Sequence, residues 1–306
     1  MLKIIGIALL VIIVIGAIAL KILGNRPAAP KDYQQTTETG GAIEAKYIAN
    51  GPYQVSTRED ATLLDFGKFI VYYPSELETS DRQYPVIVIC NGSGTPLSKY
   101  STVAEHYASW GFIVIGTEES NAWNAFGAEM SLRYLERWNE NVQIEDAVSI
   151  FYQKVDFDNV GIVGHSQGGV GVINAITDTK HKDVYKTAVS LSPTNKELAH
   201  NLFWDYDASL IDIPILLIAG EGGGDDWVVT GEQLQAIYDD IGSNKMMVRR
   251  LSTAHNEVLY MPDGYITAWF LWQLQGDEEA ANAFIGDAPE IMTNPLYQDQ
   301  ACSFSN

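Results

Sequence analysis

The sequence predicts an α/β fold, with a mostly parallel central sheet, helices on both of its faces, and an N-terminal hydrophobic helix in front of it. From about residue 47 onward, short runs rich in β-branched residues alternate with longer amphipathic runs. Several of the short runs are continuously apolar, as expected of parallel strands that are buried on both faces. The 306 residues are enough for one large domain with a full core and appendages.

The expected strands share a β-branched or aromatic composition and lie at residues 68–73, 85–90, 112–116, 160–164, 187–191 and 214–219, with a weaker one at 246–251. The expected helices are amphipathic and lie at residues 100–110, 128–138, 143–154, 167–176, 231–241 and 264–275. Strands and helices that alternate in this way build a parallel sheet covered on both sides. Ligands of such sheets bind beyond the carboxyl ends of the strands, so the residues after each strand are the candidates for chemistry.

Residues 1–24 differ in composition from the rest of the chain. The run from Ile4 to Leu20 carries no charge, and its length is at the lower limit for a membrane-spanning helix. The sequence Ala17-Ile18-Ala19 has the small-x-small form of a signal-peptide cleavage site. Because the apolar run continues past that site, we favour an uncleaved anchor, with the following domain outside the cytoplasm, over a cleaved signal and secretion.

Two further segments complete the predicted organisation. Residues 25–45 are rich in Pro, Thr, Gln and Gly and show no apolar periodicity, which predicts a flexible linker. Residues 46–306 then form the main domain, which we expect to be a monomer.

Charge and cysteine content exclude several classes of function. The net charge of −20 argues against binding of nucleic acid or of anionic lipid headgroups. The sequence has two cysteines, Cys90 and Cys302, and neither a CxxC nor an HExxH motif, so we predict no metal and no cofactor. Cys90 ends an apolar strand and is expected in the core, and Cys302 is expected to be a free thiol.

The strand expected at 160–164 is followed by Gly164-His165-Ser166-Gln167-Gly168, which is a G-x-S-x-G motif. Between a buried strand and a helix of small residues, this motif predicts a sharp turn that exposes a nucleophilic serine above the sheet. The helix that follows directs its N-terminus at the same place and favours negative charge there. Ser166 is therefore the predicted nucleophile.

A serine hydroxyl needs a base to accept its proton, and the base needs an acid to orient it. His255 follows the last expected strand, where the base of such a fold belongs. The acid should follow the strand at 214–219, where Asp225 and Asp226 are adjacent. We predict Asp226 and leave Asp225 open, because three preceding glycines make the register of this loop ambiguous.

An oxyanion hole requires backbone N–H groups that point at the tetrahedral intermediate. One should belong to Gln167, and the second to the loop after residues 85–90, where Ser93 is preferred over Gly92 and Gly94. The remaining expected contacts with the substrate are made by residues beside these groups, namely Gly92, His165, Thr194 and Trp227.

These motifs together make the chain resemble the α/β-hydrolase superfamily, in particular the cutinase-like polyester (PET) hydrolases and their dienelactone-hydrolase and chlorophyllase-like relatives. The likeness extends over nearly all of the chain from Gly51 to Gln300. It is carried by Gly51-Pro52-Tyr53-Gln54-Val55, Val71-Tyr72-Tyr73-Pro74, Gly92-Ser93, the run from Ala108 to Ile115, GHSQGG at 164–169, Asp226 two residues before Val228, and Ala254-His255.

The resemblance implies a serine hydrolase that cleaves small-molecule or polymeric carboxylic esters through an acyl-enzyme. Polyesterases of the family carry an aromatic residue where Ser93 stands and a tryptophan where Thr194 stands. Because these substrate-holding aromatics are missing, we expect short acyl esters to be better substrates than aromatic polyester. The alternatives are a hydrolase or transferase of amides, lactones or thioesters, a catalytically silent membrane-tethered binding protein, and a lipase with a lid at residues 195–212.

Overall fold

The computed structural model describes residues 27–141 and 148–304. The hydrophobic segment predicted at residues 1–24 lies outside these ranges. Among the helices within them, none is both long enough and apolar enough to cross a bilayer.

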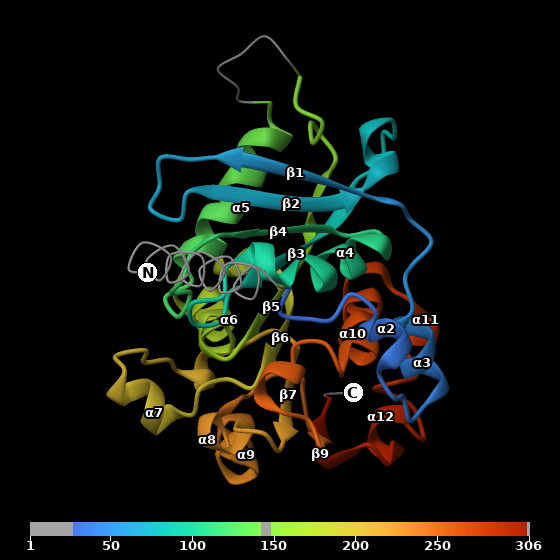
Figure 1. Cartoon of the computed structure of the whole chain (residues 1–306), viewed down its shortest axis with the longest axis vertical. Helices are drawn as coiled ribbons and strands as arrows, with labels where there is room; N and C mark the ends of the chain where they lie inside the picture. The colour runs from blue at the N-terminus through green and yellow to red at the C-terminus, as the bar shows by residue number, and fades with distance from the viewer. Residues whose placement is uncertain (1–26, 142–147, 305–306) are drawn as a thin grey trace, which may run out of the picture.

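A twisted sheet forms the centre of the molecule (Figure 1). In the described residues it has nine strands in the order β1-β2-β4-β3-β5-β6-β7-β8-β9. The neighbours from β4 to β8 are parallel, and β1, β2 and β9 join at the two edges as antiparallel strands. The strands are β1 (Val55–Ala61), β2 (Lys68–Pro74), β3 (Tyr84–Cys90), β4 (Ile113–Thr117), β5 (Val155–His165), β6 (Tyr185–Leu191), β7 (Ile215–Glu221), β8 (Lys245–Leu251) and β9 (Tyr297–Ser303).

Helices cover both faces of this sheet because the parallel strands are apolar on both sides. In β3, Val86 and Val88 belong to one buried cluster and Ile87 and Ile89 to the other. The first cluster includes α5, α6 and α9, and the second includes α3, α4 and α10. The helices are α2 (Tyr33–Thr36), α3 (Ala42–Ile48), α4 (Ser101–Ser109), α5 (Phe126–Asn139), α6 (Gln167–Asp178), α7 (Lys196–Asn201), α8 (Asp225–Val228), α9 (Gly231–Asp240), α10 (Asp263–Gln275), α11 (Glu278–Ala281) and α12 (Glu290–Thr293).

The prediction of a flexible linker at residues 25–45 is wrong for its described part. From residue 27 onward this segment packs beside α10 and α12 (Figure 1). Tyr33 is fully buried and donates a hydrogen bond to the equally buried Asp263. Glu44 is also fully buried and accepts hydrogen bonds from Arg250 Nη1 at 3.3 Å and Tyr297 Oη at 2.6 Å. The polar composition that suggested a tether thus includes buried groups that pair with distant parts of the chain.

The helix predicted at residues 143–154 is also not observed in its described part. Residues 150–154 form turns, and Ser149 N–H donates to Asn141 Oδ1 at 2.9 Å. The two edge strands β1 and β9 were not predicted, because their half-buried, polar sequences lack a clear alternation. The remaining predicted strands and helices are confirmed with shifts of one or a few residues at their ends, and β5 begins five residues earlier.

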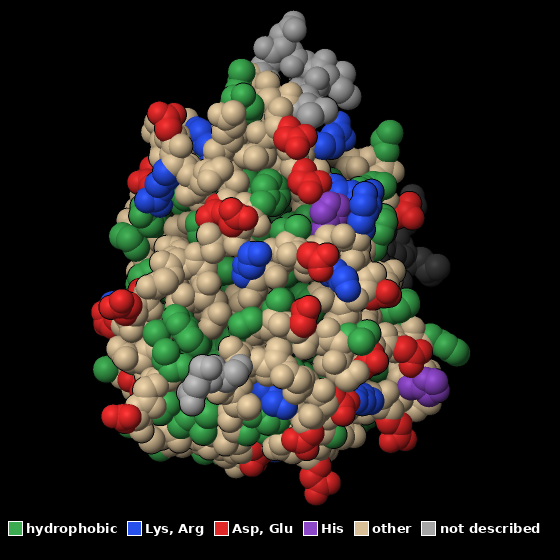
Figure 2. Space-filling view, turned by 180° about the vertical axis from the view of Figure 1, so that it is seen from behind, with side chains coloured by type: hydrophobic (Ala, Val, Ile, Leu, Met, Phe, Trp, Pro, Cys, Tyr) green, Lys and Arg blue, Asp and Glu red, His purple; other side chains and the backbone are tan. Residues whose placement is uncertain are grey.

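The acidic composition is distributed over the surface. Figure 2 shows Asp and Glu side chains scattered across one face of the molecule, with Lys and Arg side chains among them. On this face the basic groups do not form the continuous stripe that a nucleic-acid backbone would need.

Candidate active site

Ser166 lies at the turn between β5 and α6, which connects a central strand of the sheet to a helix. Its backbone dihedrals, φ 61° and ψ −119°, are in a region that side-chain-bearing residues rarely adopt. The turn is held by hydrogen bonds from Ser166 N–H to Leu191 O at 2.8 Å and from Gly169 N–H to Ser166 O at 2.9 Å. The hydroxyl is therefore carried on a strained and well-supported turn, at the first residues of α6.

The two flanking glycines of the motif are required by space. A Cβ on Gly168 would lie 2.2 Å from Cys90 O, and one on Gly164 would lie 2.3 Å from Gly168 O. Both clashes are with backbone atoms, which cannot move aside as a flexible side chain can. The pattern G-x-S-x-G thus follows from close packing of β3, β5 and α6.

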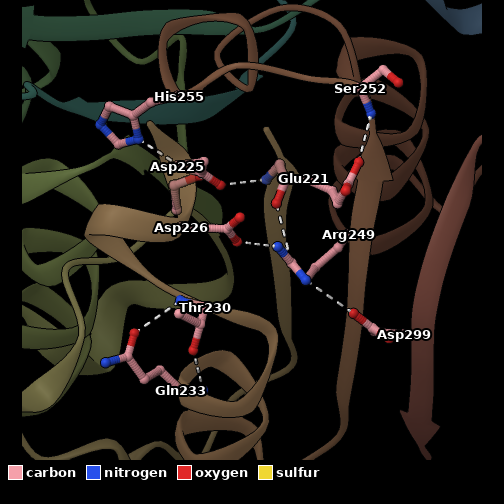
Figure 3. Close-up of polar contacts among 11 residues, drawn as sticks. Glu221, Asp225, Asp226, Thr230, Gln233, Arg249, Ser252, His255 and Asp299 are labelled. Carbon is pink, nitrogen blue, oxygen red and sulfur yellow. Dashed lines mark hydrogen bonds and ion pairs between the residues drawn. The ribbon is translucent and has the colours of Figure 1, made fainter. Parts of the chain in front are cut away.

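His255 is paired with Asp225, and this corrects the prediction of Asp226. His255 Nδ1 lies 2.6 Å from Asp225 Oδ1 (Figure 3). Asp225 is fully buried, and its Oδ2 accepts hydrogen bonds from Gly220 N–H at 2.5 Å and Ser192 Oγ at 3.0 Å. These two donors and the imidazole give the carboxylate three fixed partners, so that it is held in one orientation.

Asp226 points away from His255. Its Oδ1 lies 2.6 Å from Arg249 Nη2, and its side chain is 60% exposed. The register of the loop causes this difference, because Gly222, Gly223 and Gly224 all have positive φ and direct Asp225 inward. Such a sequence of backbone angles cannot be read from three consecutive glycines.

The amides predicted for an oxyanion hole lie at the two expected loops. Gln167 N–H is the first amide of α6, a position without a partner inside the helix. In the other loop, Gly92 N–H donates to Tyr100 Oη at 2.8 Å and Gly94 N–H donates to Ser120 O at 3.0 Å. Of the three amides that the sequence left open, only that of Ser93 has no such bond within the described residues.

The predicted substrate contacts separate into buried and exposed residues. His165 is 6% exposed, and its Nε2 lies 2.8 Å from His255 O, with 4.4 Å between the centres of the two rings. Thr194 is 2% exposed, so its side chain is not on the surface. Its carbonyl accepts a hydrogen bond from Tyr206 Oη. Gly92 is buried as well, whereas Trp227 in α8 is 75% exposed. His165 and Thr194 are therefore largely inaccessible, whereas the side chain of Trp227 is accessible to solvent.

His165 connects the turn that carries Ser166 to the backbone of His255. Burial, aided by the nearby His255, lowers the pKa of His165 to about 3, so its imidazole is neutral under ordinary conditions. A neutral ring whose Nε2 faces a carbonyl oxygen must carry its proton on that nitrogen. His165 thus donates to the backbone of His255 and links Ser166 to the loop that carries the base.

Three further residues around the site were not predicted from the sequence. Ser192 Oγ donates a hydrogen bond to Asp225, and Tyr100 Oη accepts one from Gly92 N–H. Neither residue lies in a recognisable motif. Glu119 is partly buried, and its carbonyl accepts a hydrogen bond from Asn91 Nδ2 at 2.9 Å; burial raises the pKa of its carboxyl to about 7 against the lowering effect of Gly127 N–H and Thr117. Two of them share a positional signal, because Ser192 directly follows β6 and Glu119 comes two residues after the end of β4. No group of three or more His, Cys, Asp or Glu side chains able to hold a metal gathers in the described ranges.

A central strand, a serine on a strained turn, and a histidine held by a buried carboxylate are the features of a serine hydrolase of the α/β-hydrolase fold. Residues 28–284 match the family model described as PET hydrolase-like. The chain belongs to this family.

Several curated proteins are similar to the chain. Bis(hydroxyethyl) terephthalate hydrolase of Streptomyces coelicolor is 26% identical over 64% of this chain and 57% of its own length. Cutinase est1 of Thermobifida alba is 28% identical over 60% of this chain and 55% of its own length. Cutinase cut1 of Thermobifida fusca is 26% identical over 60% of this chain and 51% of its own length. The chain thus spans little more than half the length of these relatives.

Proposed function

We propose that the chain hydrolyses carboxylic esters through an acyl-enzyme on Ser166, with His255 as the base and Asp225 as the orienting acid. The observation that carries this proposal is the pairing of His255 Nδ1 with the fully buried Asp225 at 2.6 Å, next to the strained turn of Ser166. The family and the printed names of the relatives, a terephthalate ester hydrolase and cutinases, support ester bonds as the target.

The reaction follows from the roles of these groups. Ser166 Oγ attacks the ester carbonyl carbon, and its proton passes to His255 Nε2. Because Asp225 accepts a hydrogen bond from Nδ1–H, it selects the tautomer of the neutral imidazole whose Nε2 has a free lone pair and can act as the base. The oxyanion that forms accepts hydrogen bonds from the N–H groups of Ser93 and Gln167.

Collapse of the tetrahedral intermediate releases the alcohol, which leaves with the proton held by His255. A water molecule then attacks the acyl group while giving a proton to the same nitrogen, and the carboxylic acid departs as Ser166 recovers its proton. No metal or cofactor takes part in any of these steps.

We further propose that short acyl esters are better substrates than solid aromatic polyester. Ser93 offers no ring, and Thr194 is buried, so neither position provides the flat face that would hold a terephthalate group. We propose that Trp227, which is 75% exposed and follows Asp225 and Asp226 in α8, contacts the acyl or alcohol portion.

We also propose that residues 1–24 take this domain out of the cytoplasm, as a retained anchor or a cleaved signal. The N-terminal sequence of the mature protein distinguishes the anchor from the signal.

The test of the proposed function is turnover of p-nitrophenyl esters of graded acyl length by the wild type and by Ser166→Ala. We expect Ser166→Ala to lower turnover by roughly three orders of magnitude or more. Amide, lactone and thioester analogues in the same panel determine which acyl bond is preferred. Activity of Ser166→Ala within tenfold of the wild type would refute the assignment of the nucleophile.

A further inference from the structure

The loop that carries Asp225 has little intrinsic rigidity. Between the end of β7 and Asp225 lie Gly222, Gly223 and Gly224, with φ values of 145°, 48° and 90°. Glycine has more accessible backbone conformations than any other residue, so three in a row make a fixed loop entropically unfavourable. The carboxylate of Asp225 nevertheless has to stay within hydrogen-bond distance of His255.

Arg249 on β8 connects the two ends of this loop (Figure 3). Its Nε donates to Gly220 O at 3.1 Å, before the glycines, and its Nη2 donates to Asp226 Oδ1 at 2.6 Å, after them. The Arg249 side chain is 9% exposed, and its Nη1 lies 3.3 Å from Asp299 Oδ2 on β9. We call Arg249 with Gly220 and Asp226 the Arg249 bridge.

Gly220 joins this bridge directly to the candidate acid. Its C=O accepts from Arg249, and its N–H donates to Asp225 Oδ2 at 2.5 Å. Asp226, on the other side, is covalently next to Asp225. The guanidinium therefore holds Gly220, which binds the carboxylate of Asp225, and Asp226, which is next to Asp225 in the chain. It does not contact His255.

A guanidinium suits this task because it is planar, always charged, and presents its donors in a rigid fork. Each of its three nitrogens has a carbonyl or carboxylate partner here, and a charged donor makes these hydrogen bonds stronger than neutral ones. The hydrogen bond from Arg249 Nε to Gly220 O is buried, so solvent does not compete for it, whereas Asp226 and Asp299 are partly exposed. A lysine would offer a single point of charge and could not hold both ends of the loop in the same geometry.

We propose that Arg249 is a positioning residue for the reaction: it acts through Gly220 and Asp226 to hold Asp225 against His255. This inference rests on the proposed function, since it assigns Asp225 the role of the acid. It also gives Asp226 a role that differs from the one predicted from the sequence, as the anchor that ties α8 to β8.

The test compares kcat and KM of the full chain for a soluble p-nitrophenyl ester in four forms: wild type, Arg249→Met, Arg249→Lys and Asp226→Asn. Misplacement of a catalytic group by about 1 Å can lower the rate about 100-fold, so we expect kcat of Arg249→Met to fall about 10- to 100-fold. KM should change by less than about threefold, because Arg249 does not contact the substrate, and a binding contact would appear in KM. Arg249→Lys should recover part of the loss, and Asp226→Asn should show a smaller decrease in kcat than Arg249→Met.

A second readout reports on the carboxylate directly. The Nδ1 proton of His255, which is shared with Asp225, should give a low-field NMR resonance that is identified by its disappearance in Asp225→Asn. We expect this resonance to broaden or move in Arg249→Met. The matched control is Arg133→Met, which removes an arginine that is 45% exposed and paired with Glu129 within α5, and should change neither kcat nor the resonance.

The outcomes separate this proposal from the proposed function. If the wild type hydrolyses esters and Arg249→Met keeps its kcat within twofold, with an unmoved resonance, the positioning role is refuted. If Arg249→Met does not fold, Asp226→Asn decides, because the side chain of Asp226 is exposed and its replacement places no charge in the interior. A kcat and a resonance equal to those of the wild type would then refute the bridge. If the wild type has no hydrolase activity, the proposed function itself fails.

Discussion

Replacing Asp225 with asparagine should remove most of the activity while leaving the fold in place. The carboxylate accepts three hydrogen bonds, from His255 Nδ1 at 2.6 Å, Gly220 N–H at 2.5 Å and Ser192 Oγ at 3.0 Å. An asparagine keeps one acceptor oxygen and introduces an NH₂ group. Because all three partners of the carboxylate are donors, the NH₂ group must face either His255 or the Gly220 and Ser192 donors. If the NH₂ faces His255, the imidazole has to place its proton on Nε2, which then cannot accept the proton of Ser166.

The expected loss follows from this change of tautomer. In another serine hydrolase the equivalent substitution lowers kcat about 10⁴-fold, which corresponds to about 5 kcal/mol of transition-state free energy. The matched control is Asp226→Asn, whose side chain is 60% exposed and contacts Arg249 instead of His255. We expect its kcat to fall about 3- to 20-fold, which is about a tenth to a third of the Asp225→Asn effect on a logarithmic scale.

The assay is initial-rate hydrolysis of a p-nitrophenyl ester, with the folded fraction of each variant determined by circular dichroism. Equal losses for the two aspartates would show that the hydrogen-bonding pattern around His255 does not determine the tautomer. A larger loss for Asp226→Asn would return the role of the acid to Asp226 and refute the reasoning.

Three further predictions concern stability and substrate binding. Glu119 has a folded-state pKa of about 7 against a usual value of 4.5, so the stability that it contributes below pH 4.5 is lost as pH rises through 7. In urea unfolding, Glu119→Gln should therefore be more stable than the wild type at pH 8, by at most about 3 kcal/mol. At pH 4.5 the variant should have no such advantage over the wild type. Gly168→Ala places a Cβ 2.2 Å from Cys90 O, and should lower the unfolding free energy by about 3 kcal/mol or more or prevent soluble expression. Trp227→Ala should raise KM for aromatic esters about fivefold, with little change in kcat, because an aromatic contact contributes about 1 kcal/mol.

Each of these has an outcome that contradicts it. An equal effect of Glu119→Gln at both pH values would mean that the carboxyl does not titrate between them. A fully stable Gly168→Ala would mean that β3 and α6 can separate, and an unchanged KM in Trp227→Ala would place the substrate elsewhere.

The parts of the fold that could be predicted from the sequence are those in which one strong pattern acts locally. The strands β3, β5 and β7 are continuous apolar runs, and their burial on both faces makes the assignment independent of any partner. The turn at Ser166 was predictable because the small residues on both sides of it are dictated by backbone contacts.

The errors arise where distant residues decide the structure. Glu44 and Tyr33 lie in a segment of tether-like composition, yet they are buried because Arg250, Tyr297 and Asp263 provide partners more than 200 positions away in the chain. The choice between Asp225 and Asp226 depended on the dihedrals of three glycines, and glycine adopts almost any of them. No periodicity or motif contains this information.

The central claim is that a covalent acyl-enzyme forms on Ser166, and mass spectrometry of the quenched reaction measures this most directly. During turnover of a p-nitrophenyl ester, the peptide that contains Ser166 should gain the mass of the acyl group, and the gain should be absent in Ser166→Ala. An acyl group found on a different residue, or ester turnover that continues at the wild-type rate in Ser166→Ala, would contradict the account.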